Sequence, residues 1–322
     1  MNIAVIGAGI IGATASLAIK EAFPKSRVTV FADVFSPDTT GDGSAGLWGP
    51  FLLGDTPADD VLRWSTDMHR WLLSIWKSEA ASETGVSLLP VTRLTSAPEG
   101  YPKPNWISTV YGARELLSND LQILNDEQNA KYTFVHDYIV ILKSLNFFFR
   151  VESRKIQELD ELFSEGFDLL VNCSGLGARD LIKDSTVKPI RGQVSRVDAP
   201  WIFQVYLTDD DDGNYIIPNT ESVVLGGTHQ ENDYDRKIRE EDVKFIHEGC
   251  CRMAPALRGS KILNHWVGLR PGRPRVRLET ESVRVIHNYG HGGSGVTLSW
   301  GCALEVVKII RDLKAEKSPS KL

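Results

Sequence analysis

The first 33 residues alternate between short apolar runs and polar turns, in the order strand, helix, strand. Residues 3–6 form an apolar run of strand length, residues 13–23 carry apolar side chains at helical spacing, and residues 27–31 form a second apolar run. A glycine-rich turn, residues 7–12 (GAGIIG), separates the first run from the helical segment. This order predicts a βαβ unit with two parallel strands.

The periodicity changes further along the chain. Trp and Leu at helical spacing in residues 55–83 predict a helix with a packed apolar face. Residues 84–135 read as mixed strands and loops, and residues 138–150 fit either a buried strand or the end of a helix. The remaining elements that we expect are strands at 151–159 and 169–172, alternating strands within 190–229, a helix at 240–253, a strand at 283–289 and a helix at 296–314.

This order of elements predicts an α/β fold with two domains. The βαβ start and the closing strand–turn–helix belong together in a Rossmann-like domain, into which an antiparallel-sheet α+β substrate domain is inserted. We expect the discontinuous nucleotide domain to comprise residues 1–54, 151–182 and 281–322. The inserted domain then comprises residues 55–150 and 183–280.

The turn GxGxxG has the chemistry of a pyrophosphate site. Gly7 permits the tight turn, Gly9 lets backbone N–H groups approach the phosphates, and Gly12 allows the helix to pack closely on the strand. Asp33 follows the second strand, about 20 residues after the turn, where an acidic side chain reaches a ribose hydroxyl. This motif predicts a bound dinucleotide without distinguishing NAD from FAD.

A second glycine-rich turn lies near the end of the chain. Residues 287–295 (HNYGHGGSG) precede the last predicted helix. Backbone N–H groups at such a helix N-terminus can stabilise the negative charge of a reduced flavin ring, so the turn favours FAD. The alternative is a simple junction between a loop and a helix.

Four arginines occur in the short run LRPGRPRVR, residues 269–277. The planar guanidinium pairs with a carboxylate through two hydrogen bonds, and the prolines stiffen the segment. One of these arginines is a candidate clamp for a substrate carboxylate. The alternative is a solvated basic stretch.

Composition narrows the possible partners. The chain has 322 residues and a net charge of −6, which disfavours nucleic acid and an anionic membrane as partners. Apolar runs are too short to span a bilayer, and no metal site is expected. The four cysteines show no disulfide spacing, so we expect free, buried thiols.

The chain resembles the D-amino-acid oxidase and D-aspartate oxidase family over almost its full length. The matching segments are VIGAGIIG, VTVFADVFSPDTT, SAGLWGP, VNCSGLGAR, PIRGQV, NYIIPN, VVLGGT, VGLRPGRPRVRLE and VIHNYGHGGSGVTLSWGCALE. The resemblance implies a Rossmann-like FAD-binding domain. It also implies oxidation of a D-amino acid by oxygen to a 2-oxo acid, ammonia and hydrogen peroxide.

The resemblance assigns roles to individual residues. Arg270 and Tyr215 would bind the α-carboxylate of the substrate, and the carbonyl of Gly293 would hold its amine. The residues expected to contact FAD are Gly7, Ala8, Gly9, Ile11, Gly12, Asp33, Thr39, Thr40, Ala45, Gly46, Leu47, Ile156, Ser174, Gly292, Ser294, Gly295, Val296 and Thr297.

Two features favour acidic substrates, D-aspartate or D-glutamate. A buried side-chain carboxylate needs a second cation, and His229 follows the LGGT segment, where neutral-substrate members resemble LGG-[IV]-F. Only thirteen residues separate Trp201 from Tyr215, which resembles a short lid. The acidic loop Asp209 to Asp212 would repel a dianion unless it faces solvent, and neutral D-amino acids remain the alternative.

The chain ends in Ser320, Lys321 and Leu322, which match the receptor-read peroxisomal signal. We therefore expect a peroxisomal matrix protein that binds the import receptor. Two less favoured hypotheses are an NAD-dependent dehydrogenase on the same fold and a flavin-binding protein with impaired catalysis. The second arises because residues 132–150 depart from the family pattern close to Ile156.

Overall fold

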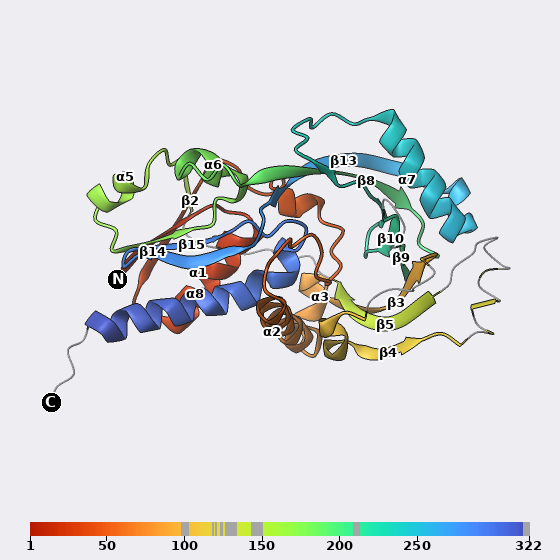
Figure 1. Ribbon diagram of the computed structural model, residues 1–322, viewed down its shortest axis with the longest axis horizontal. Helices are drawn as coiled ribbons and strands as arrows, with labels where there is room; N and C mark the ends of the chain where they lie inside the picture. The colour runs from red at the N-terminus through yellow and green to blue at the C-terminus, as the bar shows by residue number, and fades with distance from the viewer. Residues whose placement is uncertain are drawn as a thin grey trace.

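The computed structural model of the protein describes residues 1–97, 103–117, 119, 121–122, 125, 134–142, 151–208 and 213–317. Within these residues the chain forms two β-sheets with helices packed on them (Figure 1). The first sheet has the spatial order β14 (Arg277–Ser282), β15 (Val285–Tyr289), β7 (Leu169–Asn172), β1 (Asn2–Ile6), β2 (Arg27–Ala32) and β6 (Val151–Ser153). Its neighbouring strands are parallel except for the β14–β15 pair.

The second sheet is mostly antiparallel. Its spatial order is β12 (Gln230–Glu231), β8 (Lys188–Asp198), β11 (Val223–Gly226), β10 (Tyr215–Pro218), β9 (Val205–Thr208), β3 (Ser87–Thr95), β5 (Phe134–Leu142) and β4 (Tyr111–Glu115). The long strand β13 (Lys261–Gly272) pairs antiparallel with β8. The β3–β9 pair is parallel.

Helices cover both sheets. They are α1 (Ile10–Ala22), α2 (Ala58–Trp76), α3 (Ala81–Thr84), α5 (Leu159–Ser164), α6 (Ala178–Leu181), α7 (Glu240–Met253) and α8 (Gly295–Lys317). Short 3₁₀ turns lie at η1 (Thr40–Gly43), η2 (Asn105–Thr109), η3 (Gly175–Gly177) and η4 (Pro255–Gly259). Figure 1 shows α1 and α8 beside the first sheet and α7 beside the second. Among the residues described, no helix is both long and apolar enough to cross a membrane.

The predicted fold class is confirmed, and the elements differ most from the expectation in four places. The first helix begins at Ile10, because the chain turns into it directly after Gly9. The helix expected over 55–83 ends at Trp76, and α3 follows as a separate turn. The strand expected over 151–159 stops at Ser153 and α5 begins at Leu159. The basic run of residues 269–277 had no predicted element, and β13 continues through Pro271 to Gly272.

The expected domain boundaries can be compared with the residues that form the first sheet. Strands of the first sheet come from residues 2–32, 151–172 and 277–289. β14 therefore begins before the expected boundary at residue 281 and pairs with β15 beyond it. Of residues 138–150, the structure describes the end of β5, and residues 143–150 lie outside the part described.

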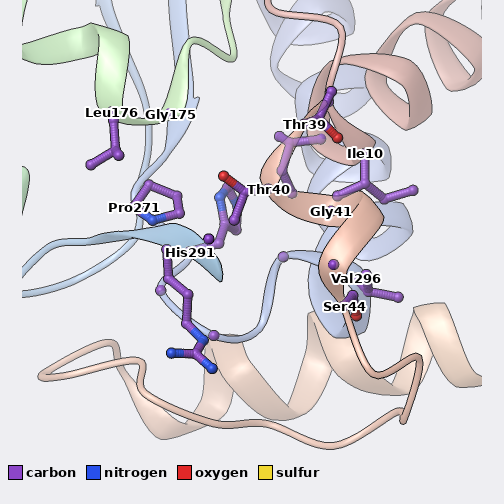
Figure 2. A pocket seen from close by; sticks show the side chains of 18 of the residues that line it. Ile10, Thr39, Thr40, Gly41, Ser44, Gly175, Leu176, Pro271, His291 and Val296 are labelled. Atoms are coloured by element: carbon purple, nitrogen blue, oxygen red, sulfur yellow. The ribbon is translucent and has the colours of Figure 1, made fainter. Parts of the chain in front are cut away.

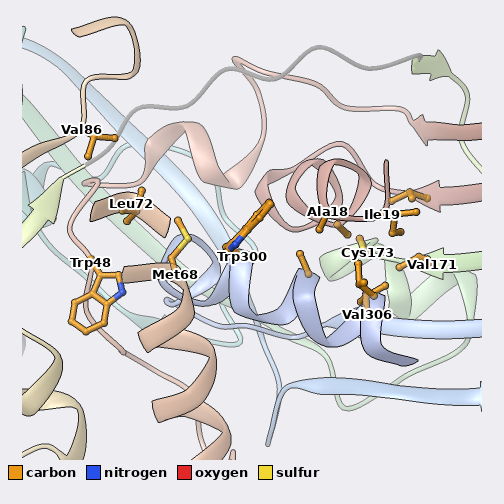
Figure 3. Packing of buried hydrophobic residues seen from close by; sticks show 14 of the residues in the cluster. Ala18, Ile19, Trp48, Met68, Leu72, Val86, Val171, Cys173, Trp300 and Val306 are labelled. Atoms are coloured by element: carbon orange, nitrogen blue, oxygen red, sulfur yellow. The ribbon is translucent and has the colours of Figure 1, made fainter. Parts of the chain in front are cut away.

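The main core joins the two sheets to helices α1, α2 and α8. Figure 3 shows Met68 of α2 between Leu72 of the same helix and Trp300 of α8, with Trp48 nearby. Trp300 also stacks on Trp71 with ring centroids 4.5 Å apart. Each fully buried large apolar side chain stabilises the fold by about 1.5–3 kcal/mol. All four cysteines are buried and free, as the sequence predicted.

Candidate active site

A cavity of about 570 Å³ is lined by residues from both sheets. Figure 2 shows Ile10, Thr39 and Val296 on one side of it, and Leu176 and Pro271 on the other. Turns that follow strands of the first sheet and strands of the second sheet thus both contribute to the cavity wall.

The glycines of the first turn have the geometry of a phosphate-binding loop. A β-carbon on Gly12 would lie 1.9 Å from the carbonyl oxygen of Gly7, and Gly7 has a φ of +110°. Gly9 has no atom within 4 Å of an added β-carbon, so its backbone faces open space in the cavity. Gly9 is also the N-cap of α1, whose first turn contains no acidic side chain. The positive end of the helix dipole is thus available to an anion.

Fifteen of the eighteen predicted cofactor residues line the cavity. They are Gly7, Ala8, Gly9, Ile11, Asp33, Thr39, Thr40, Ala45, Gly46, Leu47, Ile156, Ser174, Gly292, Gly295 and Val296. Of the other three, Gly12 supports the turn as described above.

Ser294 and Thr297, which were expected to contact FAD, have another position in the structure. The Ser294 hydroxyl donates to the carbonyl of Phe51 and accepts from its N–H, both at 2.6 Å. The Thr297 hydroxyl makes the same pair of contacts with Gly49, both at 3.1 Å. These two side chains attach the start of α8 to the segment 49–51 and do not line the cavity.

Two buried polar residues indicate that the cavity receives a polar ligand. Both amide atoms of Asn288 and Nε2 of His291 have no hydrogen-bond partner within the described chain, although both residues are buried and line the cavity. Leaving such groups unpaired costs about 1–3 kcal/mol each. Burial lowers the pKa of His291 to about 3, so its imidazole is neutral. The glycine cradle and these unpaired groups fit a dinucleotide with a polar ring.

The sequence interpretation did not select Asn288 or His291 as site residues. For Asn288 the available signal was a polar side chain within a predicted strand, and all five residues of β15 are indeed buried.

The part of the cavity wall that belongs to the second sheet is built by strand alternation. Every second residue of three strands lines it, namely Gly192 and Val194 of β8, Tyr215 and Ile217 of β10, and Trp266, Gly268 and Arg270 of β13. Arg191 and Gln193 alternate with these residues and face α7, where Arg191 lies 2.6 Å from Asp242. Period-two alternation therefore separates a ligand-facing surface from a packed one.

Arg270 and Tyr215, both predicted to bind the substrate carboxylate, lie together on the ligand-facing surface. Burial lowers the pKa of Arg270, and its electrostatic interaction with the neighbouring Tyr215 opposes this change. Nη1 also donates to the carbonyl of Thr228 at 2.9 Å. Burial raises the pKa of Tyr215, so its O–H stays protonated and available as a donor. Because no described carboxylate forms an ion pair with Arg270, the guanidinium can take an anionic ligand.

Two of the other arginines in the basic run, Arg273 and Arg277, contact side chains within the protein. Nε of Arg273 lies 3.0 Å from Asp184, and Arg277 donates to the hydroxyl of Tyr289 at 2.9 Å. Arg275 is exposed and does not line the cavity. Only the tertiary contacts identify Arg270 as the arginine that faces the cavity.

The remaining two predicted residues lie apart. Gly293 lines the main cavity, and a β-carbon on it would lie 2.6 Å from the Phe51 ring. His229 lies outside that cavity and lines a smaller one of about 150 Å³ with Gln230 and Asp242. Its ring packs edge-on against Phe51 at 6.3 Å. The structure thus does not place His229 beside Arg270 on the wall of the main cavity.

Comparison with known proteins gives consistent results. Residues 145–309 match a family model described as FAD dependent oxidoreductase. The chain is 34% identical to human D-aspartate oxidase, covering 97% of this chain and 95% of that protein. It is 35% identical to a D-amino acid oxidase of Dugesia ryukyuensis, covering 97% and 98%, and 35% identical to D-aspartate oxidase 1 of Caenorhabditis elegans, covering 96% and 97%.

Solved structures share the fold at lower identity. Glycine oxidase from Geobacillus kaustophilus superposes with a TM-score of 0.73 at 17% identity, covering 99% of this chain and 95% of that one. L-proline dehydrogenase from P. horikoshii superposes with a TM-score of 0.68 at 15% identity, covering 97% and 93%.

Proposed function

Because the chain belongs to the D-amino-acid oxidase and D-aspartate oxidase family of FAD-dependent oxidoreductases, we propose that it oxidises acidic D-amino acids. The substrates are D-aspartate and D-glutamate, and the products are the 2-oxo acid, ammonia and hydrogen peroxide. The observation that carries this proposal is the partly buried guanidinium of Arg270, which interacts with Tyr215 and lines the cavity without a carboxylate partner in the described chain.

Arg270 and Tyr215 bind the α-carboxylate in this mechanism. The guanidinium supplies charge and a fixed pair of donors, and the phenolic O–H adds a third donor. The carbonyl of Gly293, which lines the same cavity, accepts a hydrogen bond from the amine. Two fixed contacts on the same α-carbon leave its hydrogen pointing in one direction, so positioning is the main contribution of the protein.

FAD, the cofactor of the family, supplies the hydride acceptor and the reaction with oxygen when it is bound. Its dinucleotide fits the turn of Gly7 and Gly9, and the unpaired amide of Asn288 fits the polar atoms of its ring system.

Neither His291 nor Cys173, which both line the cavity, can act as a titrating base there. His291 is neutral at all pH values well above 3 and is fully buried. Burial also raises the pKa of the Cys173 thiol, which leaves it protonated. The substrate therefore reacts as the neutral amine, losing a hydride from the α-carbon and a proton from nitrogen. Water then hydrolyses the imine to the 2-oxo acid and ammonia.

Two observations support acidic substrates over neutral ones. Arg93 lines the same cavity as Arg270, on the face of the second sheet that carries Tyr215. The short connection between Trp201 and Tyr215 points the same way. Oxidation of neutral D-amino acids is the second candidate, because the relatives include D-amino acid oxidases at equal identity.

The proposal extends to location. Ser320, Lys321 and Leu322 match a peroxisomal signal, and a peroxide-producing reaction suits that compartment. These three residues and the acidic loop Asp209 to Asp212 lie outside the described part of the chain. Fusion of the last ten residues to a fluorescent protein, with and without Leu322, tests the signal directly.

The activity is tested by anaerobic mixing of the flavin-loaded protein with D-aspartate, D-glutamate, D-alanine and D-methionine. We expect loss of flavin absorbance to be fastest with the acidic pair. Bleaching mainly by D-alanine and D-methionine would favour the neutral-substrate alternative, and absence of bleaching by all four would contradict the proposed reaction.

A further inference from the structure

Arg93, Leu207 and Tyr215 form a row across three neighbouring strands of the second sheet. Arg93 of β3 is paired with Leu207 of β9, and Leu207 is paired with Tyr215 of β10. All three residues line the main cavity. Neighbouring strands lie about 4.8 Å apart, so the backbones of Arg93 and Tyr215 are separated by roughly 10 Å.

Strand alternation fixes the side of the sheet on which this row lies. Val91, two residues before Arg93, is paired with Val205, and both belong to the main core. Leu94, which points the other way, belongs to the separate core under α7 together with Ile216. Arg93 therefore shares its face with Tyr215 by the geometry of the sheet and not by a flexible side-chain choice.

We propose that Arg93 binds the side-chain carboxylate of the acidic D-amino acid, and this inference rests on the proposed function. With its α-carboxylate on Arg270 and Tyr215, a substrate places its second carboxylate one or two methylene groups further from the α-carbon. A carboxylate removed from water needs a cationic or hydrogen-bonding partner. The row directs Arg93 toward this position from the far side of Leu207, and the arginine side chain covers the remaining distance.

The other cations on the cavity wall are less well placed. Arg154 and Lys155 follow β6, a strand of the first sheet, and so lie apart from the row. Arg236 follows β12 at the opposite edge of the second sheet from β3.

The segment that carries Arg236 is held on the α7 side of the sheet. Nε of Arg191 donates to the carbonyl of Asp235 at 2.9 Å, and its Nη2 donates to that of Lys237 at 2.7 Å. Arg191 itself faces away from the cavity.

The test compares kcat/KM for D-aspartate and D-asparagine, which differ in charge and hardly in shape. Arg93→Gln should reduce kcat/KM for D-aspartate by about tenfold to a hundredfold, the effect of losing one charge-assisted pair. Turnover of D-asparagine should change little. Arg236→Gln is the matched control, because it removes one positive charge from the same cavity and should largely preserve the ratio of the two substrates.

Binding without turnover provides a second readout. Succinate and butyrate differ by one carboxylate, and calorimetry on the flavin-loaded protein measures both. Arg93→Gln should weaken succinate binding about tenfold and leave butyrate binding unchanged. A crystal structure of the wild-type holoenzyme with succinate tests the contact without any variant, and we expect the second carboxylate in an ion pair with Arg93.

The outcomes separate this inference from the proposed function. An unchanged substrate ratio in Arg93→Gln, an equal loss in Arg236→Gln, or succinate bound to Arg236 or His229 in the crystal would overturn the role of Arg93 and leave the acidic preference standing. If the wild-type enzyme shows no preference for D-aspartate over D-asparagine, the proposed function itself fails.

Discussion

Gly192 of β8 and Arg270 of β13 face each other so closely that a β-carbon on Gly192 would lie 2.3 Å from Nη1 of Arg270. The glycine leaves the space that the guanidinium occupies on the cavity wall. Gly226 has the same relation to Tyr215, whose Cζ would lie 2.0 Å from an added β-carbon. Glycines within strands thus leave space for the two residues that are predicted to bind the substrate carboxylate.

Gly192→Ala should therefore impair activity more than stability. The added methyl group meets the movable end of a side chain, so we expect the guanidinium to shift and kcat/KM to fall by about tenfold to a hundredfold. Flavin content and melting temperature should stay close to wild type. Gly259→Ala is the control, because no atom lies within 4 Å of its added β-carbon. Equal kinetics in the two variants would contradict this account.

Arg270→Ala should abolish turnover of acidic and neutral D-amino acids alike, since both present an α-carboxylate. Loss of a buried charged pair of about 4 kcal/mol corresponds to roughly a thousandfold in kcat/KM. Flavin should remain bound, which the absorbance spectrum reports. Arg270→Lys keeps the charge without the planar fork and should recover only part of the activity. Near-normal kcat/KM in the alanine variant would refute the assignment.

The His229→Phe variant tests the role that the sequence predicted for His229 against its position in the structure. If His229 binds the side-chain carboxylate of the substrate, this variant selectively loses activity toward D-aspartate. Because His229 lines the smaller cavity and packs on Phe51, we expect the ratio of D-aspartate to D-alanine activity to change little. A selective loss of D-aspartate turnover would restore the original assignment.

Asp242→Asn should destabilise the second sheet. Arg191 is fully buried, and its ion pair with Asp242 at 2.6 Å supplies its charged partner. Breaking a buried pair by removing one partner costs about 3–5 kcal/mol. Urea unfolding of the flavin-loaded protein measures this cost. Asp233→Asn, which breaks a more exposed pair with Arg239, should cost much less. Similar midpoints for the two variants would argue against a structural role for the Arg191 pair.

The lowered pKa of the Asp184 carboxyl leads us to expect that part of the pH dependence of stability comes from this residue. Burial raises the pKa of its carboxyl, but hydrogen bonds from Thr186, Tyr289 and Arg273 outweigh burial and hold the pKa well below its usual range. In the unfolded chain the carboxyl takes up a proton near pH 4, while in the folded protein it resists protonation. Its stabilisation is therefore present above about pH 4 and is lost as the pH falls below it.

We expect Asp184→Asn to lose about 2 kcal/mol of stability at pH 7. The variant should also show a shallower fall in melting temperature between about pH 5 and pH 2 than the wild type. Parallel melting curves for the two proteins over this range would show that Asp184 does not contribute.

Local sequence was sufficient for the elements whose signals are local. The strand at 169–172 and the helix at 240–253 have the predicted bounds, and the turn of Gly7, Gly9 and Gly12 lies where its spacing placed it. These elements depend on periodicity and on backbone freedom at single glycines, and both can be read within a few residues. The resemblance in the ordered motifs added the family and with it the cofactor.

Only the tertiary structure decided which polar side chains meet. Four arginines in one basic run were equivalent in sequence, and the pairing of β13 with β8 placed Arg270 alone in the cavity. The structure moved His229 out of that cavity and brought in Arg93, which lies 122 residues before Tyr215 in the chain yet only two strands away in the sheet. Alternation along a strand fixes which residues share a face, but the partner opposite each residue is set by strand order and register, which depend on packing of the whole chain.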